Sequence, residues 1–245
     1  MKILVCISHV PDTTSKISFT DNNTKFDQTG VQYIIGPYDD YALARAVELK
    51  EQHGGSITVL NVGEAETEPT LRKALAIGAD EAIRVNAFPE DSFFVANQIA
   101  ACAKDQGFDL ILMGRESIDF NGGQVHGMVG ELLGTPALSP VMTLDIEGST
   151  AKMTREIEGG KESIEADLPL VLGCQEPIAE WKIPNMRGIM TARTKPLNVV
   201  DPNSDEARTK TASFELPPEK GAIKMIDSDN VDELVDLLKN EAKVL

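Results

Sequence analysis

The chain has 245 residues, of which 42% are hydrophobic and 25% are charged, and this composition is typical of globular domains with a substantial core. It carries 23 lysine and arginine residues against 39 aspartate and glutamate residues, which gives a formal net charge of −16. Such a charge repels phosphate backbones and anionic membrane surfaces, so we expect no nucleic-acid partner and no membrane insertion. A bound anion must then be held locally, by backbone N–H groups or a helix N-terminus.

Cysteine usage and the first residues bear on the compartment. Cys6, Cys102 and Cys174 are an odd number without Cys-x-x-Cys spacing, which argues against a disulfide framework and a structural zinc site. The apolar run that follows Lys2 is shorter than the ~7–15 residues of a signal-peptide core. No stretch approaches the ~18 apolar residues of a membrane span. We therefore expect a cytoplasmic chain.

The first part of the chain alternates between short apolar runs and amphipathic stretches. Predicted strands cover 3–7, 57–62, 81–85 and 110–114, and predicted helices cover 39–52, 68–77, 93–104 and a stretch around Val129 and Leu132. A polar, hairpin-like segment, 17–29, follows the first strand. The run 3–7 is almost wholly apolar, which is typical of a strand buried on both faces in the middle of a parallel sheet.

This alternation predicts an α/β fold, namely a Rossmann-like parallel sheet with right-handed crossovers and flanking helices. Ligands of such sheets bind beyond the carboxyl ends of the strands, near the point where the strand order reverses. We therefore expect a binding site around 6–10, 61–63 and from Gly114 onward.

The pattern changes after Pro136. Residues 142–146, 152–157 and 161–166 predict an added antiparallel β segment with a hairpin turn at Glu158-Gly159-Gly160, and 168–173 predicts another buried strand.

The end of the chain predicts an extended arm. Residues 199–221 are polar and contain prolines, as in a linker, and Val231, Leu234, Val235 and Leu238 then follow the spacing of an amphipathic helix. We expect an α/β domain over 1–200 and a linker with its helix over 201–245. The spacing alone leaves open whether this helix folds back on its own domain or docks elsewhere.

A glycine-rich segment follows the predicted strand 110–114 and leads into a helix. Such a loop can turn tightly, face a phosphate with its N–H groups and deliver it to a helix N-terminus. The segment is neither GxGxxG nor GxxxxGK[ST], so it is either a nucleotide loop or an ordinary turn between strand and helix. It consists of Gly114, Arg115, Glu116, Ser117, Ile118, Asp119, Phe120, Asn121, Gly122, Gly123, Gln124 and Val125.

The sequence offers no hydrolytic or metal-binding constellation. His9, His53 and His126 lie apart without metal-ligand spacing, and no serine sits in a GxSxG turn. Asp39 and other aspartates near predicted strand ends, Asp12 and Asp119, are expected to cap helices and orient loops.

The segment 181–195 combines the only tryptophan with Met186 and Met190 and with the basic residues Arg193 and Lys195. Flexible thioethers beside basic groups suit an adaptable surface for an acidic partner. A helix that covers its own core is the other interpretation.

Six stretches of the chain, taken in order, resemble the small (beta) subunit of electron-transfer flavoproteins. The resemblance covers nearly all of the first 200 residues. Its motifs are ILVCISHVPD, GPYDDYALARAVELKE, TLRKALAIGADEAIRV, LILMGRESID with its glycine-rich continuation, REIEGGKESIEADLPLVLG and EP…IMTARTKPL.

The resemblance implies one half of an electron carrier, with no substrate turnover of its own. Such subunits pair with a larger alpha subunit that holds most of a redox-active FAD. The small subunit shields this flavin and buries an AMP in its own domain. The heterodimer carries electrons singly from flavin dehydrogenases, such as acyl-CoA dehydrogenases, to a membrane quinone oxidoreductase.

The same resemblance assigns the AMP pocket to Cys6, to Gly36, Pro37, Tyr38 and Asp39, to Val62 and to the run 114–125. The family often has Asn-Pro at the position of Gly36-Pro37 and a more polar residue at Val125. Main-chain contacts tolerate such changes better than side-chain hydrogen bonds do.

The resemblance also implies two partner contacts. The segment ahead of Ile189 and Met190 resembles a recognition loop whose apolar anchor enters a pocket on the dehydrogenase. Met186 occupies the anchor position and Ile183 is its rival. The C-terminal helix is expected to dock on the alpha subunit.

Three rival interpretations remain. Bifurcating members of the family hold a second FAD in place of AMP, and Gln124-Val125 resembles their Gln-Val pair, whereas 120–123 departs from their usual Gly-Asp-Thr-Ala. We therefore favour AMP. A stand-alone nucleotide-binding stress or regulatory domain would leave REIEGGKESIEADLPLVLG and the arm without a role. A nucleotide-hydrolysing enzyme would need a P-loop lysine, which is missing.

Overall fold

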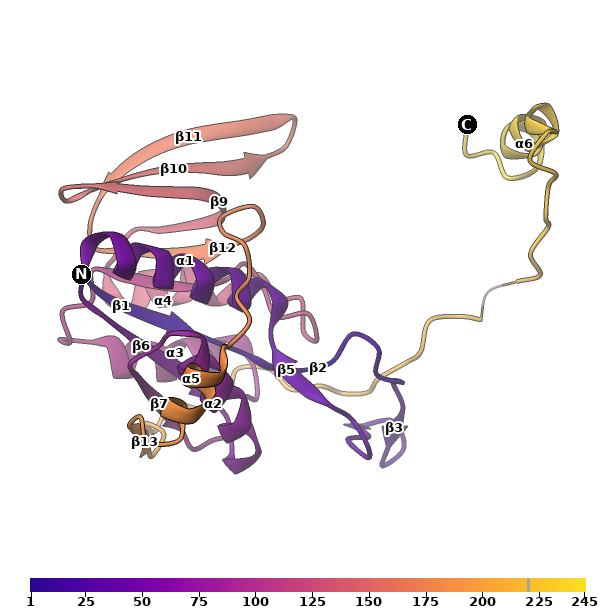
Figure 1. Cartoon of the computed structure of the whole chain (residues 1–245). Helices are drawn as coiled ribbons and strands as arrows, with labels where there is room; N and C mark the ends of the chain where they lie inside the picture. Colours follow the sequence, from indigo (N-terminus) through magenta and orange to yellow (C-terminus); the bar gives the residue numbers. More distant parts are fainter. Residues whose placement is uncertain (220) are drawn as a thin grey trace.

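A nine-stranded sheet forms the body of the protein, in a computed structural model that describes residues 1–219 and 221–245. Helices cover both of its faces (Figure 1). In spatial order the strands are β11 (Gly160–Asp167), β10 (Thr150–Ile157), β9 (Ala137–Glu147), β12 (Leu170–Cys174), β8 (Leu110–Gly114), β1 (Lys2–Cys6), β6 (Ser56–Val62), β7 (Glu81–Val85) and β13 (Leu197–Val200).

The strands from β9 to β13 in this order run parallel to one another, and only β10 and β11 are antiparallel additions. The chain starts at β1, continues outward to β6 and β7, and then returns to the other side of β1 as β8. The strand order therefore reverses between β1 and β8, next to the expected site. The Rossmann-like α/β prediction and the interior position of the first strand are confirmed.

The four helices predicted between residues 39 and 133 are present, with small shifts at the ends, and α5 lies in the segment 181–195, which the sequence left open. The predicted helix 39–52 begins earlier, because Pro37 fits the first helical position, and it ends at Gly54. The helices of the body are α1 (Pro37–His53), α2 (Glu68–Ile77) after a short turn η1 (Ala65–Thr67), α3 (Ser92–Ala103), α4 (Val125–Leu133) and α5 (Met186–Ala192).

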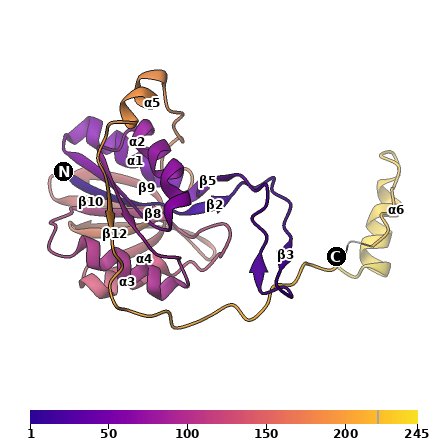
Figure 2. The ribbon, with the colours of Figure 1, turned by 90° about the horizontal axis from the view of Figure 1, so that it is seen from below.

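Alternate side chains of β1 divide the core into two apolar layers. Ile3 and Val5 pack in the layer that α1 and α2 cover, whereas Leu4 and Cys6 pack in the layer under α3 and α4. Figure 2 shows these two pairs of helices on opposite sides of the sheet. Because side chains alternate along a strand, an almost wholly apolar run such as 3–7 can serve both layers.

Two small ribbons lie outside the large sheet. The predicted hairpin contains β3 (Phe19–Thr20) and β4 (Lys25–Phe26). A second ribbon, β2 (His9–Pro11) with β5 (Tyr33–Ile35), was not expected from the sequence. Its pairing joins residues more than twenty positions apart, and short strands of this kind carry little periodic signal.

The antiparallel segment is confirmed, but its first strand starts at Ala137 rather than Met142. The early residues of β9 pair in parallel with β12, and the later ones pair antiparallel with β10. One strand thus links the parallel and antiparallel parts of the sheet. At the predicted hairpin turn, Gly159 has a φ of +84°, a conformation that favours glycine.

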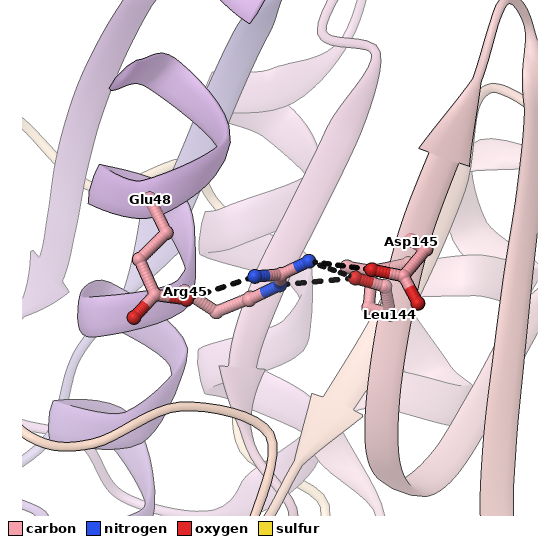
Figure 3. Close-up of polar contacts among 4 residues, drawn as sticks. All are labelled: Arg45, Glu48, Leu144 and Asp145. Carbon is pink, nitrogen blue, oxygen red and sulfur yellow. Dashed lines mark hydrogen bonds and ion pairs between the residues drawn. The ribbon is translucent and has the colours of Figure 1, made fainter. Parts of the chain in front are cut away.

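Arg45 of α1 is buried and fastens this antiparallel segment to the body. Its guanidinium donates to the carbonyl oxygen of Leu144 in β9, at 3.0 Å from Nε, and contacts Glu48 at 2.8 Å and Asp145 at 3.1 Å (Figure 3). A buried arginine needs such partners because an unpaired buried charge is very costly.

The predicted linker begins too early. Val199 and Val200 belong to β13, which pairs with β7 at the edge of the sheet, because the apolar side of this short strand completes the core beside β7. Lys220, which also falls in the predicted linker, lies outside the described residues.

Beyond the body, the chain carries a short C-terminal helix, α6 (Val231–Asp236), and a π-helical turn, η2 (Leu237–Glu241). Figures 1 and 2 show α6 standing well apart from the sheet, and none of its residues is buried. The helix therefore does not fold back on its own domain. Within residues 1–219 and 221–245, no helix has both the length and the apolar character needed to cross a lipid bilayer.

Candidate functional site

The carboxyl ends of β1, β6 and β8 meet the N-terminus of α1 at the reversal point of the sheet. Asp39, in the first turn of α1, joins the end of β1 to the end of β8. Its buried carboxylate accepts hydrogen bonds from Ser8 N–H (2.8 Å), from the Ser8 hydroxyl and from Gly114 N–H (2.7 Å). These bonds confirm the expectation that Asp39 orients loops, but the expectation that it caps a helix is wrong, because Gly36 is the N-cap residue of α1 and no side chain caps this helix.

Burial removes the Asp39 carboxyl from water and so disfavours its charged form. Burial raises its pKa from the ordinary value of 3.8 to about 6, although the hydrogen bonds from Ser8 and Gly114 act in the opposite direction. Burial, followed by the charge of Asp39, also raises the pKa of the Cys6 thiol well above its ordinary value. Cys6 is therefore a protonated, apolar core residue rather than a reactive thiol.

Two glycines allow α1 to approach these strand ends. A Cβ at Gly114 would lie 2.7 Å from Tyr38 Cβ and 2.7 Å from an Asp39 carboxylate oxygen. A Cβ at Gly36 would collide with the Ser8 hydroxyl and the Asp39 carboxylate. The local packing therefore explains why both positions are glycine.

Arg115 follows Gly114 and is held on three sides. Its guanidinium lies 4.8 Å from the centre of the Tyr38 ring and donates to Glu116 at 2.9 Å and to Gln175 at 2.9 Å. Gln175, which follows β12, was missed by sequence reasoning, because its proximity depends on the pairing of β12 with β8. The site thus offers one fixed cation close to the glycine-rich loop.

The loop itself turns through two left-handed positions before α4 begins. Asn121 has a φ of +52° and Gly123 a φ of +59°, both in the region that Asn and Gly adopt most easily. A Cβ at Gly122 would lie 3.0 Å from the Phe120 ring and 3.1 Å from the Ser92 hydroxyl, so a larger residue would crowd both groups. Gln124 then precedes α4 without a side-chain cap, so the first N–H groups of this helix are not taken by a capping side chain.

Not every expected site residue presents a side chain to a ligand. Cys6 and Val62 are buried in the apolar layer under α3 and α4, against which Val125 also packs. Cys6 and Val62 therefore turn their side chains into the core, whereas Val125 is only half-buried. The fold nevertheless brings 36–39, Gly114 and Arg115 into direct contact, as the hydrogen bonds and the stacking show.

Ser8 and Asn61, within the strand ends already singled out, add polar groups to the site. Asn61 is buried and donates through Nδ2 to the Ile7 carbonyl (2.9 Å), but its Oδ1 is a buried acceptor without a hydrogen-bond partner. Such an atom is costly unless something supplies a donor. The uncapped helix and the cation fit a phosphorylated ligand, and the orphaned acceptor lies at the end of the nearby strand β6.

A second candidate surface is formed by α5 and the segment before it. Ile183 and Met186 are 74% and 75% exposed, and Trp181, Ile189 and Met190 are also exposed. Asn185 caps α5 by accepting from Gly188 N–H at 2.8 Å, so this apolar surface stands on an ordered turn.

The inner side of α5 covers α2. Ala192 is buried there, and Arg72 of α2 donates to the carbonyls of Ala192 (3.0 Å) and Lys195 (2.9 Å). The helix therefore covers its own core with one face and exposes methionines on the other.

One expectation for this surface is wrong. Lys195 does not face a partner, because its ammonium donates to the carbonyls of Leu75 (2.8 Å) and Ala79 (2.5 Å) at the end of α2. Of the two basic residues expected to attract a partner, only Arg193 is exposed.

Two hollows of the described surface lie on this side of the molecule and contain no residue of 114–125. One, of about 620 Å³, lies between α2 and α5, and the other, of about 180 Å³, lies beside Trp181 and the start of α1. Within residues 1–219 and 221–245, no three His, Cys, Asp or Glu side chains gather closely enough to hold a metal ion.

The sheet order and the glycine-rich loop at its reversal point define a Rossmann-like α/β protein. The family model described as "Electron transfer flavoprotein domain" matches residues 23–205. The chain belongs to the electron transfer flavoprotein family, and within it to the beta subunits.

Relatives from distant organisms share this sequence over its full length. The chain is 38% identical to a protein of Bacillus subtilis (strain 168), with all of both chains covered. It is 35% identical to one of Syntrophomonas wolfei, with 100% of this chain and 98% of the relative covered. It is 31% identical to a mitochondrial protein of Oryza sativa, again over all of both chains. All three are named electron transfer flavoprotein subunit beta.

Proposed function

We propose that this chain is the small subunit of a heterodimeric electron carrier. It pairs with an alpha subunit that holds most of an FAD, shields that flavin, and buries AMP at the carboxyl edge of its own sheet. FAD, when bound, supplies the one-electron redox chemistry, and this chain turns over no substrate. The observation that carries the proposal is the glycine-rich loop at the reversal point of a sheet whose family is that of electron transfer flavoproteins.

Each polar feature of the edge has a role toward AMP in this proposal. The N–H groups of the loop 114–125 and of the first turn of α4 hold the phosphate, and Arg115 contributes a positive charge beside them in a protein whose net charge is negative. Asn61 Oδ1 accepts a hydrogen bond from the ligand. Asp39 bonds only protein groups and keeps Gly114 in place, so it acts on the ligand indirectly.

Dehydrogenases, with acyl-CoA dehydrogenases as the example, dock on the surface around α5. Met186 is the proposed anchor and Ile183 the rival, with Ile189 and Met190 beside them. Support comes from the exposure of these side chains on a turn that Asn185 fixes. An exposed, flexible thioether can fill an apolar pocket on a partner.

The arm, 201–245, is the part that docks on the alpha subunit, and 1–200 form the nucleotide-binding domain. The arm displays apolar side chains that its own chain does not cover, among them Ile223 (80% exposed) and Met225 (85% exposed). The heterodimer works in the cytoplasm and passes its electrons to a quinone oxidoreductase.

The test is a count of bound groups. The chain is purified together with its alpha subunit, and FAD and AMP released by denaturation are measured per heterodimer. One FAD and one AMP are expected. Two FAD and no AMP would support the bifurcating form, and a complex without flavin would overturn the proposal.

A variant connects this count to the site. Arg115→Gln removes the fixed cation but keeps a side chain that can bond Gln175, so AMP content should fall while FAD content stays. Lys152→Gln is the matched control, because Lys152 is exposed and pairs with Glu147 at the turn between β9 and β10. Equal AMP in both variants would remove Arg115 from the proposed site.

A further inference from the structure

The first part of the arm does not behave as a linker. After β13 the chain runs past α3 and then past the β3–β4 hairpin before it leaves the body (Figure 2). Between Val200 and Phe214 it makes hydrogen bonds to both of these elements. We call residues 201–214 the arm root.

Asp91 accepts three of these hydrogen bonds. One carboxylate oxygen caps α3 by accepting from Phe94 N–H at 2.7 Å. The other oxygen accepts three hydrogen bonds from the arm root, from Arg208 N–H (2.7 Å), Thr209 N–H (2.7 Å) and the Thr209 hydroxyl (3.0 Å). The residue is only 6% exposed.

Such an arrangement needs a carboxylate. Capping a helix requires a single acceptor, and Ser or Asn would serve equally well. Holding the arm root at the same time requires a second acceptor oxygen pointing the other way. Hydrogen bonds to an ionised acceptor are also about twice as strong as neutral ones. Capping α3 therefore does not by itself require a carboxylate at position 91, whereas holding the arm root as well does.

Further contacts lie on both sides of Asp91. Asn203 N–H donates to Gln98 on α3 at 2.8 Å, and the Gln98 amide donates back to the Asn203 side chain. Arg208 stacks on Phe93 at 4.7 Å. At the far end, Phe214 stacks on Phe19 at 4.8 Å and donates to the Asn23 carbonyl at 2.7 Å. The arm root is therefore held along its length.

We propose that Asp91 is a positioning residue for heterodimer assembly, which fixes the arm root on α3 so that residues 215–245 leave the body at a set place. The inference rests on the proposed function in that the arm docks on the alpha subunit. A tethered arm loses less conformational freedom on docking and stays at a higher effective concentration near its binding surface. Asp91 touches neither the nucleotide loop nor α6, so it acts through the arm root.

The test uses Asp91→Asn in the full chain. Asparagine keeps the shape and can cap α3, but its amide has one acceptor oxygen and cannot serve both sides. Hydrogen exchange of 205–211 in the unpaired chain should accelerate at least about tenfold, while α3 keeps its protection. The dissociation constant of the heterodimer should rise about tenfold.

Asp105→Asn is the matched control. It removes the same charge at the opposite end of α3, at an exposed position with a φ of +58° that asparagine tolerates. It should leave both the exchange of the arm root and the affinity unchanged. Equal loss of affinity in Asp105→Asn would attribute the effect to net charge and overturn the inference.

A double-mutant cycle with Leu234→Ser separates this inference from the proposed function. Leu234 lies on α6, which has no buried residue, so the substitution acts on docking rather than folding. If Asp91 works through the arm, the two affinity losses are less than additive. Unchanged exchange, or strictly additive losses, would overturn the role of Asp91. An unaffected affinity in Leu234→Ser would instead contradict arm docking itself.

Discussion

The body and the arm of this protein treat apolar side chains in opposite ways. In the body, Leu4, Leu43 and Leu60 are fully enclosed between the sheet and its helices. In the arm, Ile223 and Met225 are almost fully exposed, and α6 presents Val231 and Leu234 to solvent. An amphipathic helix gains most of its stability from packing its apolar face. The body thus completes its core alone, whereas the apolar side chains of the arm stay uncovered by its own chain, as the proposed docking on the alpha subunit requires.

Deletion of 227–245 should have the largest effect on assembly. Loss of the apolar face of α6 removes several buried side chains from the proposed interface, so the dissociation constant of the heterodimer should rise at least about a thousandfold. The unpaired body should unfold at the same denaturant concentration as the full chain, because α6 has no buried residue. Titration calorimetry and urea unfolding measure the two quantities. A truncated chain that pairs normally would remove the contrast between body and arm.

Gly114→Ala should instead damage the body. The added methyl group would meet Tyr38 Cβ and the Asp39 carboxylate at 2.7 Å, so the start of α1 must shift. We expect a loss of about 3 kcal/mol in the free energy of unfolding, as in an overpacked core, together with loss of AMP. Gly160→Ala is the control, because Gly160 lies in β11, away from the proposed site, and a Cβ there meets no atom within 4 Å. Equal stability of the two variants would show that the start of α1 can shift to admit the methyl group at little cost in free energy.

Met186→Ala tests whether an exposed surface of the body also has a partner. A buried interface anchor contributes about 2 kcal/mol, so electron transfer from the partner dehydrogenase should slow about thirtyfold while the heterodimer stays intact. Ile183→Ala is the comparison, since both side chains are similarly exposed. Stopped-flow reduction of the heterodimer gives the rates. A large effect in Ile183→Ala alone would move the anchor there.

The smallest effect concerns the pH dependence of the body. The folded-state pKa of Asp39, about 6, lies above its ordinary value of 3.8, so the folded protein binds this proton more tightly than the unfolded chain. The contribution of Asp39 to stability is therefore present below about pH 4 and is lost as the pH rises through 6. The difference in unfolding free energy between the wild type and Asp39→Asn should fall by about 1 kcal/mol per pH unit in this window. Urea titrations between pH 4 and 7 measure it. A difference that rises with pH would contradict the raised pKa.

Much of the body could be predicted because its signals are local. The apolar run 3–7 predicts a strand that is buried on both faces. The spacing of apolar residues predicts the helices, and glycines at 54, 78 and 134 follow their last residues. The ribbon of β2 and β5 and the strand β13 escaped prediction. Their few residues pair with segments far away in the sequence, and the spacing of apolar residues does not predict such a pairing.

The candidate site was predictable in its place but not in its internal contacts. Strand ends 6–10 and 61–63 pointed to Ser8 and Asn61 without giving either a role. That Asp39 bonds Ser8 and Gly114, or that Gln175 reaches Arg115, depends on β1, β8 and β12 lying side by side. Likewise, Lys195 looked like a residue for a partner and proved to serve the end of α2.

The sequence by itself determined the α/β class, the order of most elements, the glycine-rich loop and the family. These follow from apolar periodicity, turn residues and motifs, which are properties of neighbouring positions. Only the tertiary structure decided that Asp39 is a buried link rather than a helix cap, and that Asp91 holds the arm root to α3. Both carboxylates bond groups between 31 and 118 positions away. Such bonds exist only once the chain has folded, because burial and the meeting of distant strands create them.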